Sequence, residues 1–242
     1  MGVLFNLIIK IIDFFYQKKK YSVLKKRIPK NIDILIDVGA HHGDTISEFL
    51  KIFQIKKIYA FEPSKRNFKE LKKKTELIEK QNSVKIKIYQ CGLGEKKEVM
   101  QLTEIADGVS NTFNNLNMSS KYLKKKRFIT TFFGMGKFIK DEVPTKIIPL
   151  KEIIKLEKIE RIDLIKIDTE GFEYNTLVGM DREIKKVRFV LFEHHYDNMI
   201  IKNYKFKDIH TLLIDNGFQK VYKIKMPFRK SFDYIYENQA EV

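Results

Sequence analysis

Short apolar runs alternate with helically spaced apolar residues along most of the chain. The run at 32–36 is followed by apolar positions 46, 49, 50 and 53, which recur at the spacing of one helix face. The runs at 57–61 and 84–89, with a helical pattern between them, repeat this order. Strands that alternate with helices in this way predict an α/β fold with a mainly parallel sheet.

The same order returns in the second half of the chain. Residues 164–167 and 187–192 are typical of buried strands, and a helical pattern lies between them. The tail predicts a helix over 209–216 and strands near 221–222 and 234–236, which would complete a seven-stranded, mostly parallel sheet with helices on both faces.

Residues 95–150 interrupt this order. They do not form one regular unit, although 99–102 and 128–132 have the composition of extra strands. A polar loop over 108–115 and a basic cluster over 121–127 lie between them. We expect an insertion or lid over the ends of the strands.

The first 30 residues precede the alternating pattern. Asn6, Lys10, Asp13 and Gln17 form one polar stripe of a helix, opposite a wide apolar face, and basic runs follow at 18–20 and 25–27. The segment is too short and too charged to span a membrane, and it lacks the features of a secretory signal. This amphipathic helix either contacts a membrane through residues 1–27 or docks on the main domain or on a second subunit. We therefore divide the chain into 1–30 and 31–242.

The first chemical motif follows the first strand, and reads Asp37-Val38-Gly39-Ala40-His41-His42-Gly43. Glycines allow a sharp turn and close approach of a ligand. Glu62 ends the next strand, where a carboxylate can accept both hydroxyls of a ribose. The alternative is an ordinary turn with a solvated carboxylate. Pro63, next to Glu62, suits the start of a helix.

The spacing of the glycines distinguishes between cofactors. A dinucleotide site needs Gly-x-Gly-x-x-Gly, and its second and third glycines would fall here at His41 and Asp44. Asp37 would repel a pyrophosphate but can face a cation. S-adenosylmethionine fits better, because it carries a ribose, an ammonium and a sulfonium and no phosphate. Cys91, after the third strand, is either a wall of this pocket or a small buried hydrophobe.

The second chemical motif lies at two neighbouring strand ends. Asp168 and Glu170 follow one strand, and Glu193, His194 and His195 end the next. A hydroxyl acceptor needs a base for its proton, and these residues are the candidates, with Asp168 and Glu170 first. A divalent ion such as Mg²⁺ could act instead, although no spacing specifies one. The alternative is that Asp168 and Glu170 serve only a helix N-terminus and the histidines only the surface.

Three segments together, 37–40, 61–63 and 166–173, resemble the FkbM family of S-adenosylmethionine-dependent methyltransferases. The resemblance runs from about 32 to 193, with a weaker tail to 218. It implies a Rossmann-like class I methyltransferase fold and O-methylation, often on sugars or natural products. His41 is bulkier than is usual in the family at its position, so we expect the methionine end of the pocket to differ. The expected cofactor-binding residues are Asp37, Gly39, Ala40, His41, Gly43, Glu62, Pro63, Cys91 and Asp168, and the expected catalytic residues are Asp168, Glu170, Glu193 and His194.

Composition adds limits on compartment and partners. The chain has 242 residues and one cysteine, which excludes an internal disulfide and a CxxC motif and fits a reducing, cytoplasmic setting. The net charge of +16 suggests a polyanionic partner, but the 47 basic residues are 40 Lys and 7 Arg, which is also the result of coding bias in an AT-rich genome. Arginine, the residue suited to bidentate phosphate contacts, is scarce.

We therefore expect a small-molecule or carbohydrate acceptor rather than a nucleic acid, and leave open a homodimer and peripheral membrane contact. The alternatives are an RNA ribose methyltransferase, and a non-catalytic protein that binds membrane or nucleic acid through its basic surface. Methylation of base amines is disfavoured, because the strand end at 168–171 lacks the Asn/Asp-Pro-Pro-aromatic motif of such enzymes.

Overall fold

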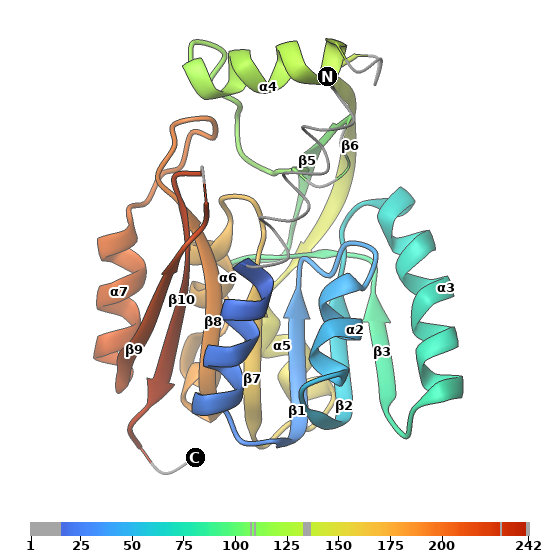
Figure 1. Ribbon diagram of the computed structural model, residues 1–242, viewed down its shortest axis with the longest axis vertical. Helices are drawn as coiled ribbons and strands as arrows, with labels where there is room; N and C mark the ends of the chain where they lie inside the picture. The colour runs from blue at the N-terminus through green and yellow to red at the C-terminus, as the bar shows by residue number, and fades with distance from the viewer. Residues whose placement is uncertain (1–15, 107, 109, 133–136, 228, 241–242) are drawn as a thin grey trace.

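The structure is a computed structural model that describes residues 16–106, 108, 110–132, 137–227 and 229–240. Its centre is a seven-stranded sheet in the order β3-β2-β1-β7-β8-β10-β9 (Figure 1). The five strands β3, β2, β1, β7 and β8 pair with one another in parallel. The strand β10 is antiparallel to both β8 and β9. The predicted seven-stranded, mostly parallel sheet is therefore confirmed. Its strands are β1 (Asn31–Val38), β2 (Gln54–Phe61), β3 (Lys85–Tyr89), β7 (Ile162–Ile167), β8 (Val187–His195), β9 (Phe218–Lys225) and β10 (Ser231–Asn238).

Helices cover both faces of this sheet, which explains why its central strands are almost continuously apolar. Helices α2 (Asp44–Leu50) and α3 (Lys65–Gln81) pack on one face. Helices α5 (Leu150–Leu156), α6 (Glu173–Val178) and α7 (Phe206–Asp215) pack on the other, together with the 3₁₀ helix Asp181–Lys186. Within the described part of the chain, no helix is both long enough and apolar enough to cross a membrane.

A helix over residues 16–27 lies on the same face as α2, in front of the middle of the sheet in Figure 1. Leu24 is fully buried there, and Tyr21 meets the ring of Phe49 edge-on at a centroid distance of 6.3 Å. The Tyr16 hydroxyl donates to Asp233 Oδ2 at 2.5 Å, and Lys20 Nζ lies 3.2 Å from the same oxygen. The described part of the N-terminal segment thus docks on the main domain. Three residues of the predicted polar stripe, Asn6, Lys10 and Asp13, lie outside the described residues, and the fourth, Gln17, lines the cavity described below.

The insertion between β3 and β7 forms a second, three-stranded sheet and a helix. The strands β4 (Gly92–Leu93), β5 (Glu98–Ile105) and β6 (Ile139–Ile148) pair in the order β4-β6-β5. The strand predicted at 99–102 is present as β5. Sequence reasoning missed β6 because Pro144 interrupts its pattern. The proline is tolerated because β4 pairs only with Ile147 and Ile148, so β6 has one neighbour at Pro144.

The strand predicted at 128–132 is wrong, because these residues form the last turns of α4 (Lys121–Phe132). Leu123 and Thr130 are buried on one side of this helix, while Phe128 and Phe132 are exposed. The Thr130 hydroxyl donates to the carbonyl of Lys126 at 2.9 Å, one turn earlier. The β-branched and aromatic residues suggested a strand, but the helical spacing of the buried positions decides the conformation.

Candidate active site

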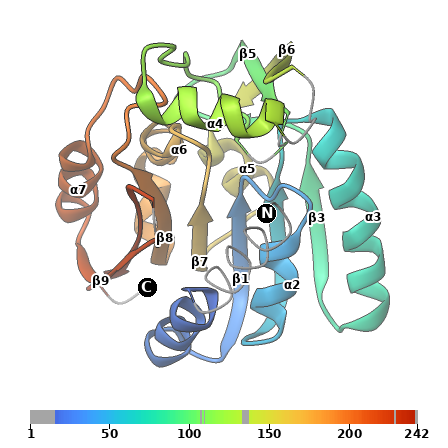
Figure 2. The same ribbon diagram turned by 45° about the horizontal axis from the view of Figure 1, so that its top comes forward.

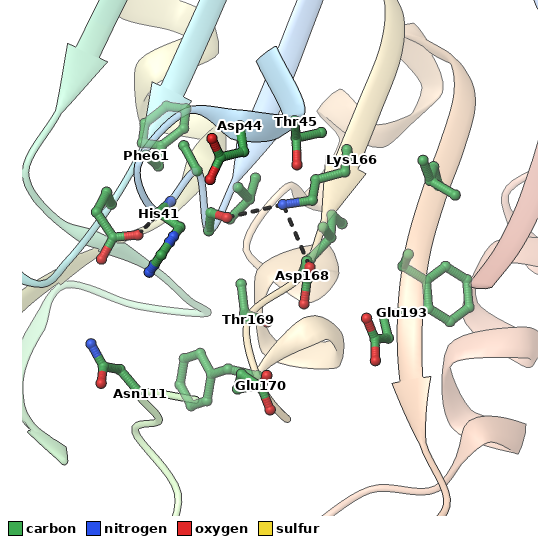
Figure 3. Close-up of a pocket in the computed structure, with 18 of the residues that line it drawn as sticks. His41, Asp44, Thr45, Phe61, Asn111, Lys166, Asp168, Thr169, Glu170 and Glu193 are labelled. Carbon is green, nitrogen blue, oxygen red and sulfur yellow. Dashed lines mark hydrogen bonds and ion pairs between the residues drawn. The ribbon is translucent and has the colours of Figure 1, made fainter. Parts of the chain in front are cut away.

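A cavity of about 300 Å³ lies at the carboxyl ends of β1, β2, β7 and β8, where open α/β sheets hold their ligands (Figure 3). Both predicted motifs reach it, and so do the insertion and the N-terminal helix. The sequence-predicted residues that line it are Gly39, Ala40, His41, Glu62, Pro63, Cys91, Asp168, Glu170 and Glu193.

Gly39 holds two strand ends together. Its φ is +75°, and a Cβ at this position would lie 1.9 Å from the carbonyl oxygen of Asp168. Only glycine therefore allows the turn after β1 to touch the end of β7. We expected the glycine to admit a ligand, but the atom it admits is protein backbone, and this contact fixes Asp168 beside the first motif.

Glu62 ties the turn after β1 to the end of β2. It is 4% exposed, its Oε2 accepts the His41 N–H at 2.8 Å, and its Oε1 accepts the Ser64 N–H at 3.0 Å. Burial raises the pKa of Glu62 to about 7, although the two backbone donors favour the charged form. Each carboxylate oxygen keeps accepting capacity for hydroxyl groups of a ligand. Ser64 caps α3, so Pro63 precedes the helix cap and is not the first helical residue.

His41 places a ring nitrogen in the cavity wall. Its φ is +50°, and its ring stacks on His42 with 3.8 Å between centroids. Burial, and secondly the charge of His42, lower the pKa of His41, which favours its neutral form. Its Nε2 has no hydrogen bond with the described residues. A ligand in the cavity could satisfy this atom.

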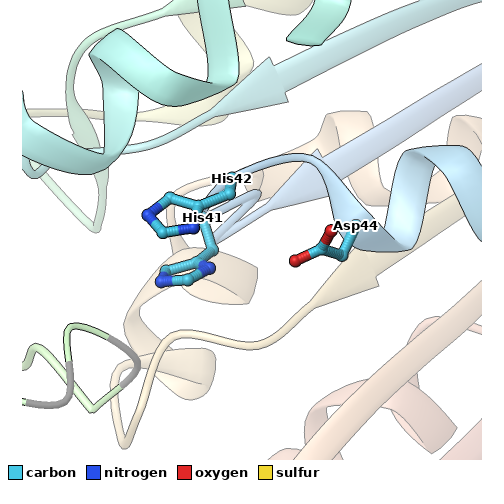
Figure 4. A group of neighbouring side chains, drawn as sticks. All are labelled: His41, His42 and Asp44. Atoms are coloured by element: carbon cyan, nitrogen blue, oxygen red, sulfur yellow. The ribbon is translucent and has the colours of Figure 1, made fainter.

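His41, His42 and Asp44 are a group of metal-type side chains whose ligand atoms lie within 4.8 Å of one another (Figure 4). The two imidazole planes are only 27° apart and stacked, so their in-plane lone pairs do not converge on one point. Asp44 is already paired with Lys74, which lowers the pKa of Asp44. This geometry favours stacked rings and an ion pair, and it gives no support to a metal ion at this group, which sequence reasoning had not considered as a metal site.

Lys166 is a buried cation in the cavity wall, and sequence reasoning included it in the 166–173 motif without assigning it a role. Its Nζ lies 3.1 Å from Asp37 Oδ1 and 3.7 Å from Asp168 Oδ2, and it donates to the Gly39 carbonyl at 2.9 Å (Figure 3). Burial alone would lower the pKa of Lys166, but the carboxylates outweigh it and raise the pKa. The available signal was a lysine that follows the apolar residues Leu164 and Ile165, on the strand next to Asp37.

Asp37 does not line the cavity, in contrast to the prediction that it faces a cationic group of the cofactor. It is 0% exposed, and the charge it faces is that of Lys166. Burial raises the pKa of Asp37, and Lys166 acts in the opposite direction. Asp37 therefore positions the lysine that links β1 to Asp168.

His195 joins the acidic side chains on the far side of the cavity. Its Nε2 lies 3.1 Å from Glu193 Oε1 and 3.6 Å from Glu170 Oε2, and its Nδ1 lies 3.6 Å from Asp197 Oδ2. Burial would lower the pKa of His195, but these carboxylates outweigh it and raise it to about 10. The ring is thus an imidazolium near neutral pH and holds no lone pair with which to act as a base.

Two of the carboxyl groups beside this imidazolium, Glu170 and Glu193, have pKa values shifted toward their neutral forms. Burial raises the pKa of Glu170, and it raises that of Glu193 well above the usual value. Asp168 adds to the shift of Glu193 through its charge, while His195 opposes it. Figure 3 shows Asp168, Glu170 and Glu193 around the same part of the cavity. Buried carboxylates with raised pKa values in a cavity are candidates for proton transfer.

His194 and Gly43 do not lie in the cavity wall, in contrast to their prediction as site residues. Successive side chains of a strand point to opposite faces, so His194 points away from Glu193 and His195. It packs among Tyr196, Tyr204 and Phe206. Burial lowers its pKa to about 3. Gly43 is the N-cap of α2, with φ of 80°.

Several cavity residues come from segments that no sequence motif marked. The N-terminal helix contributes Gln17, Lys20 and Tyr21, which the sequence presented only as part of a basic amphipathic segment. The insertion contributes Asn111 and Phe113, the turn between β9 and β10 contributes Arg229, and β10 contributes Asp233. Only the folded chain brings these segments together.

Comparisons with known proteins agree on one class. The family model described as "Methyltransferase FkbM domain" matches residues 37–220. "Methyltransferase 1" of Beauveria bassiana (strain ARSEF 2860) is 24% identical over 62% of this chain and 59% of its own length. "Methyltransferase sdnD" of Sordaria araneosa is 28% identical over 64% of this chain and 63% of its own. The chain thus spans about three fifths of the length of these curated relatives.

Solved structures share the fold at low sequence identity. Methyltransferase FkbM from Methylobacillus flagellatus KT is 15% identical, with a TM-score of 0.59 over 88% of this chain and 45% of that one. M. capricolum TrmK, in complex with S-adenosyl-homocysteine, is 11% identical, with a TM-score of 0.50 over 91% and 68%. Magnesium protoporphyrin IX methyltransferase from Synechocystis PCC 6803, with bound SAM, is 11% identical, with a TM-score of 0.50 over 95% and 79%. The Rossmann-like methyltransferase fold is thereby confirmed.

Proposed function

The chain belongs to the family of FkbM-domain methyltransferases, and from this membership we propose that it methylates a hydroxyl of a sugar, a glycolipid or a small natural product, with S-adenosylmethionine as the donor. The observation that carries the proposal is the group of carboxylates Asp168, Glu170 and Glu193 at one end of the cavity, with Glu62 at the other. A hydroxyl acceptor needs a carboxylate that can take its proton, and a ribose-bearing donor needs a carboxylate such as Glu62 that can accept hydrogen bonds from its hydroxyls.

Residues of the first motif would hold the cofactor. The Glu62 carboxylate would accept hydrogen bonds from the ribose hydroxyls, and His41 Nε2 is a polar atom in the wall that lacks a partner among the described residues. Cys91 and Phe61 supply apolar wall. The bound cofactor would supply a methyl group on a positively charged sulfur, which the carboxylates of the cavity would stabilise electrostatically.

The acceptor's proton would pass to the Asp168 and Glu193 carboxylates. Lys166 lies beside Asp168 and the His195 imidazolium lies beside Glu193, so one cation supports each carboxylate. Burial raises the pKa of Glu193, which makes its carboxylate a stronger proton acceptor than a solvated one. The charge of Asp168 acts on Glu193, so we assign the base to these two carboxylates together.

The loop that carries Asp168 is held firmly, as a catalytic group requires. Glu173 Oε1 accepts the Thr169 N–H at 3.2 Å, the Thr169 hydroxyl at 3.1 Å and the Gly171 N–H at 2.9 Å. The Tyr204 hydroxyl donates to the other oxygen of Glu173. These bonds fix the turn between β7 and α6. They favour the interpretation that Asp168 is a positioned base, and not the alternative that the turn only caps a helix.

Transfer of a labelled methyl group tests the proposal. Wild-type protein and labelled S-adenosylmethionine are incubated with pools of sugars, glycolipids, small hydroxyl compounds and RNA. We expect label in a carbohydrate, lipid or small-molecule pool. Label only in RNA would support the ribose alternative, and label in no pool would contradict the proposal. Loss of activity with EDTA, restored by Mg²⁺, would support a metal-assisted version.

Matched variants test the role of the carboxylates. Asp168→Asn and Glu193→Gln keep the size of each side chain and remove its charge. We expect transfer to fall by about 10²–10⁴ for the variant that removes the base. The affinity for S-adenosylhomocysteine should stay within a few-fold of wild type. Asp215→Asn, an exposed change on α7, is the control. Normal turnover by both cavity variants would contradict the assignment.

A further inference from the structure

Helix α4 lies across the carboxyl ends of the central strands, on the side of the cavity (Figure 2). Its inner face packs Leu123 into a small cluster with Ile105, Phe138, Met199 and Ile200. Lys126 on this helix donates to the Ser110 hydroxyl, and its charge opposes the burial that raises the pKa of Glu170, so the inner face of α4 is turned toward the acidic end of the cavity. The outer face of α4 therefore points to solvent just above the site.

The outer face of α4 combines cations with two phenylalanines. Lys121, Lys125, Phe128 and Phe132 follow one another at spacings of four, three and four, which is one line along a helix. Phe128 is 70% exposed and Phe132 is 73% exposed, and their rings stack with 6.2 Å between centroids. The burial of a phenylalanine side chain is worth about 1.5–3 kcal/mol. The core gains little of this from either ring, because the buried side of the helix is formed by other residues.

The charge of this face has one sign. Lys124 and Arg127 are exposed beside the line of four, and the whole helix Lys121–Phe132 contains no Asp or Glu. A basic helix with exposed phenylalanines is typical of segments that lie in the plane of an anionic membrane surface. Each Lys or Arg near such a surface contributes about 1 kcal/mol. The helix is about 18 Å long, which suits an in-plane position and not a span.

We propose that α4 is an interfacial helix that docks this protein on an anionic lipid bilayer through Phe128 and Phe132. The exposed cations Lys121, Lys124, Lys125 and Arg127 supply the attraction to lipid headgroups, and the two rings enter the boundary between headgroups and acyl chains. A second copy of the chain fits this face less well, because two such faces would bring like charges together.

The membrane contact also limits the chemical class of the methyl acceptor, and this step rests on the proposed function. If α4 lies on the bilayer, the cavity beneath it opens beside the membrane surface. The hydroxyl that reaches the carboxylates would then belong to the headgroup of a lipid-borne acceptor, such as a glycolipid.

The chain has no tryptophan, so one introduced tryptophan reports on one position. We would measure the emission of Phe128→Trp, in the full chain, with vesicles of phosphatidylcholine alone and with vesicles that contain phosphatidylserine. The expected result is a blue shift with the anionic vesicles only, and quenching by brominated acyl chains. Leu156→Trp, at an exposed position on α5, is the matched control and should not shift.

Sedimentation with the same vesicles tests the contribution of the face. We expect Phe128→Ser/Phe132→Ser to reduce partition onto anionic vesicles by at least about tenfold, and Lys121→Gln/Lys124→Gln/Lys125→Gln to reduce it similarly. Leu77→Ser, an exposed apolar residue of α3, is the control. Unchanged affinity for S-adenosylhomocysteine would show that these variants are folded.

Three results would overturn the proposal. They are no blue shift of Phe128→Trp on anionic vesicles, wild-type partition of the double serine variant, and a shift with single-stranded RNA but not with vesicles. None of these measurements requires methyl transfer. A protein that binds vesicles but transfers no label would contradict the proposed function alone, and the reverse would contradict the membrane contact alone.

Discussion

Lys166 shows how much of the site depends on single buried charges. It lies between Asp37, which is fully buried, and Asp168, which faces the cavity. The strand motif was recognisable from sequence, because the carboxyl ends of parallel strands meet at one edge of the sheet. The role of Lys166 within this motif was not recognisable, because it depends on a contact with Gly39, 127 residues away.

We predict that Lys166→Met destabilises the protein by about 3–5 kcal/mol, because it leaves the Asp37 charge buried without its partner. Urea denaturation measures the free energy of unfolding. The double variant Lys166→Met/Asp37→Asn should recover most of the loss, since it removes the second charge as well. A single variant as stable as wild type would show that the ion pair contributes nothing.

The raised pKa of Glu62 predicts that the affinity for the cofactor product S-adenosylhomocysteine depends on pH. Its pKa is raised to about 7 by burial, and hydroxyl donors bind better to the ionised form. The affinity for S-adenosylhomocysteine, measured by calorimetry, should therefore increase from pH 6 to pH 8. Glu62→Gln should lose this increase and, at pH 8, about 1.5–3 kcal/mol of binding free energy. Glu76→Gln, exposed on α3, is the control. The same pH dependence in Glu62→Gln would rule out the ribose assignment.

At the scale of elements, the strands and helices of the central sheet followed from periodicity, and the insertion did not. Residues 128–132 have the composition of a strand but are helical, because Leu123 and Thr130 are buried one above the other on α4. Docking of the N-terminal helix on the main domain was one of the alternatives that the sequence left open, and only the structure selects it, since the bond between Tyr16 and Asp233 joins residues 217 positions apart. Long-range packing decided both cases.

The N-terminal helix is expected to be part of the stability of the main domain. Leu24 is fully buried in the cluster shared by α2 and the central strands. Leu24→Ala should therefore cost about 2–5 kcal/mol in the free energy of unfolding. Lys25→Ala, an exposed change in the next residue, should cost less than about 0.5 kcal/mol. Equal stability of the two variants would mean that the helix is only loosely attached.

At the scale of the whole molecule, the buried titratable groups predict how stability depends on pH. The folded-state pKa values of Glu62 and His195, about 7 and about 10, both lie above the ordinary values. The folded protein therefore binds more protons than the unfolded chain between the ordinary and the raised values. This stabilisation is complete below the ordinary pKa and is lost as pH rises through the raised one.

Without cofactor, the thermal midpoint should accordingly fall from pH 6.5 to pH 10. His195→Gln should reduce the part of this fall above pH 8, because it removes the group with the higher pKa. Scanning calorimetry over this range measures the effect. A midpoint that rises with pH would contradict the charge arrangement around His195.

The central claim is that the cavity at the ends of β1, β2, β7 and β8 transfers a methyl group to a hydroxyl. The most direct measurement is the transfer of labelled methyl from S-adenosylmethionine to a glycolipid pool, with chemical identification of the labelled group. The account predicts a methyl ether in the wild-type product, and a rate about 10²–10⁴ lower in Asp168→Asn or Glu193→Gln at unchanged S-adenosylhomocysteine affinity. A labelled amine as the product, or full activity in both variants, would contradict it.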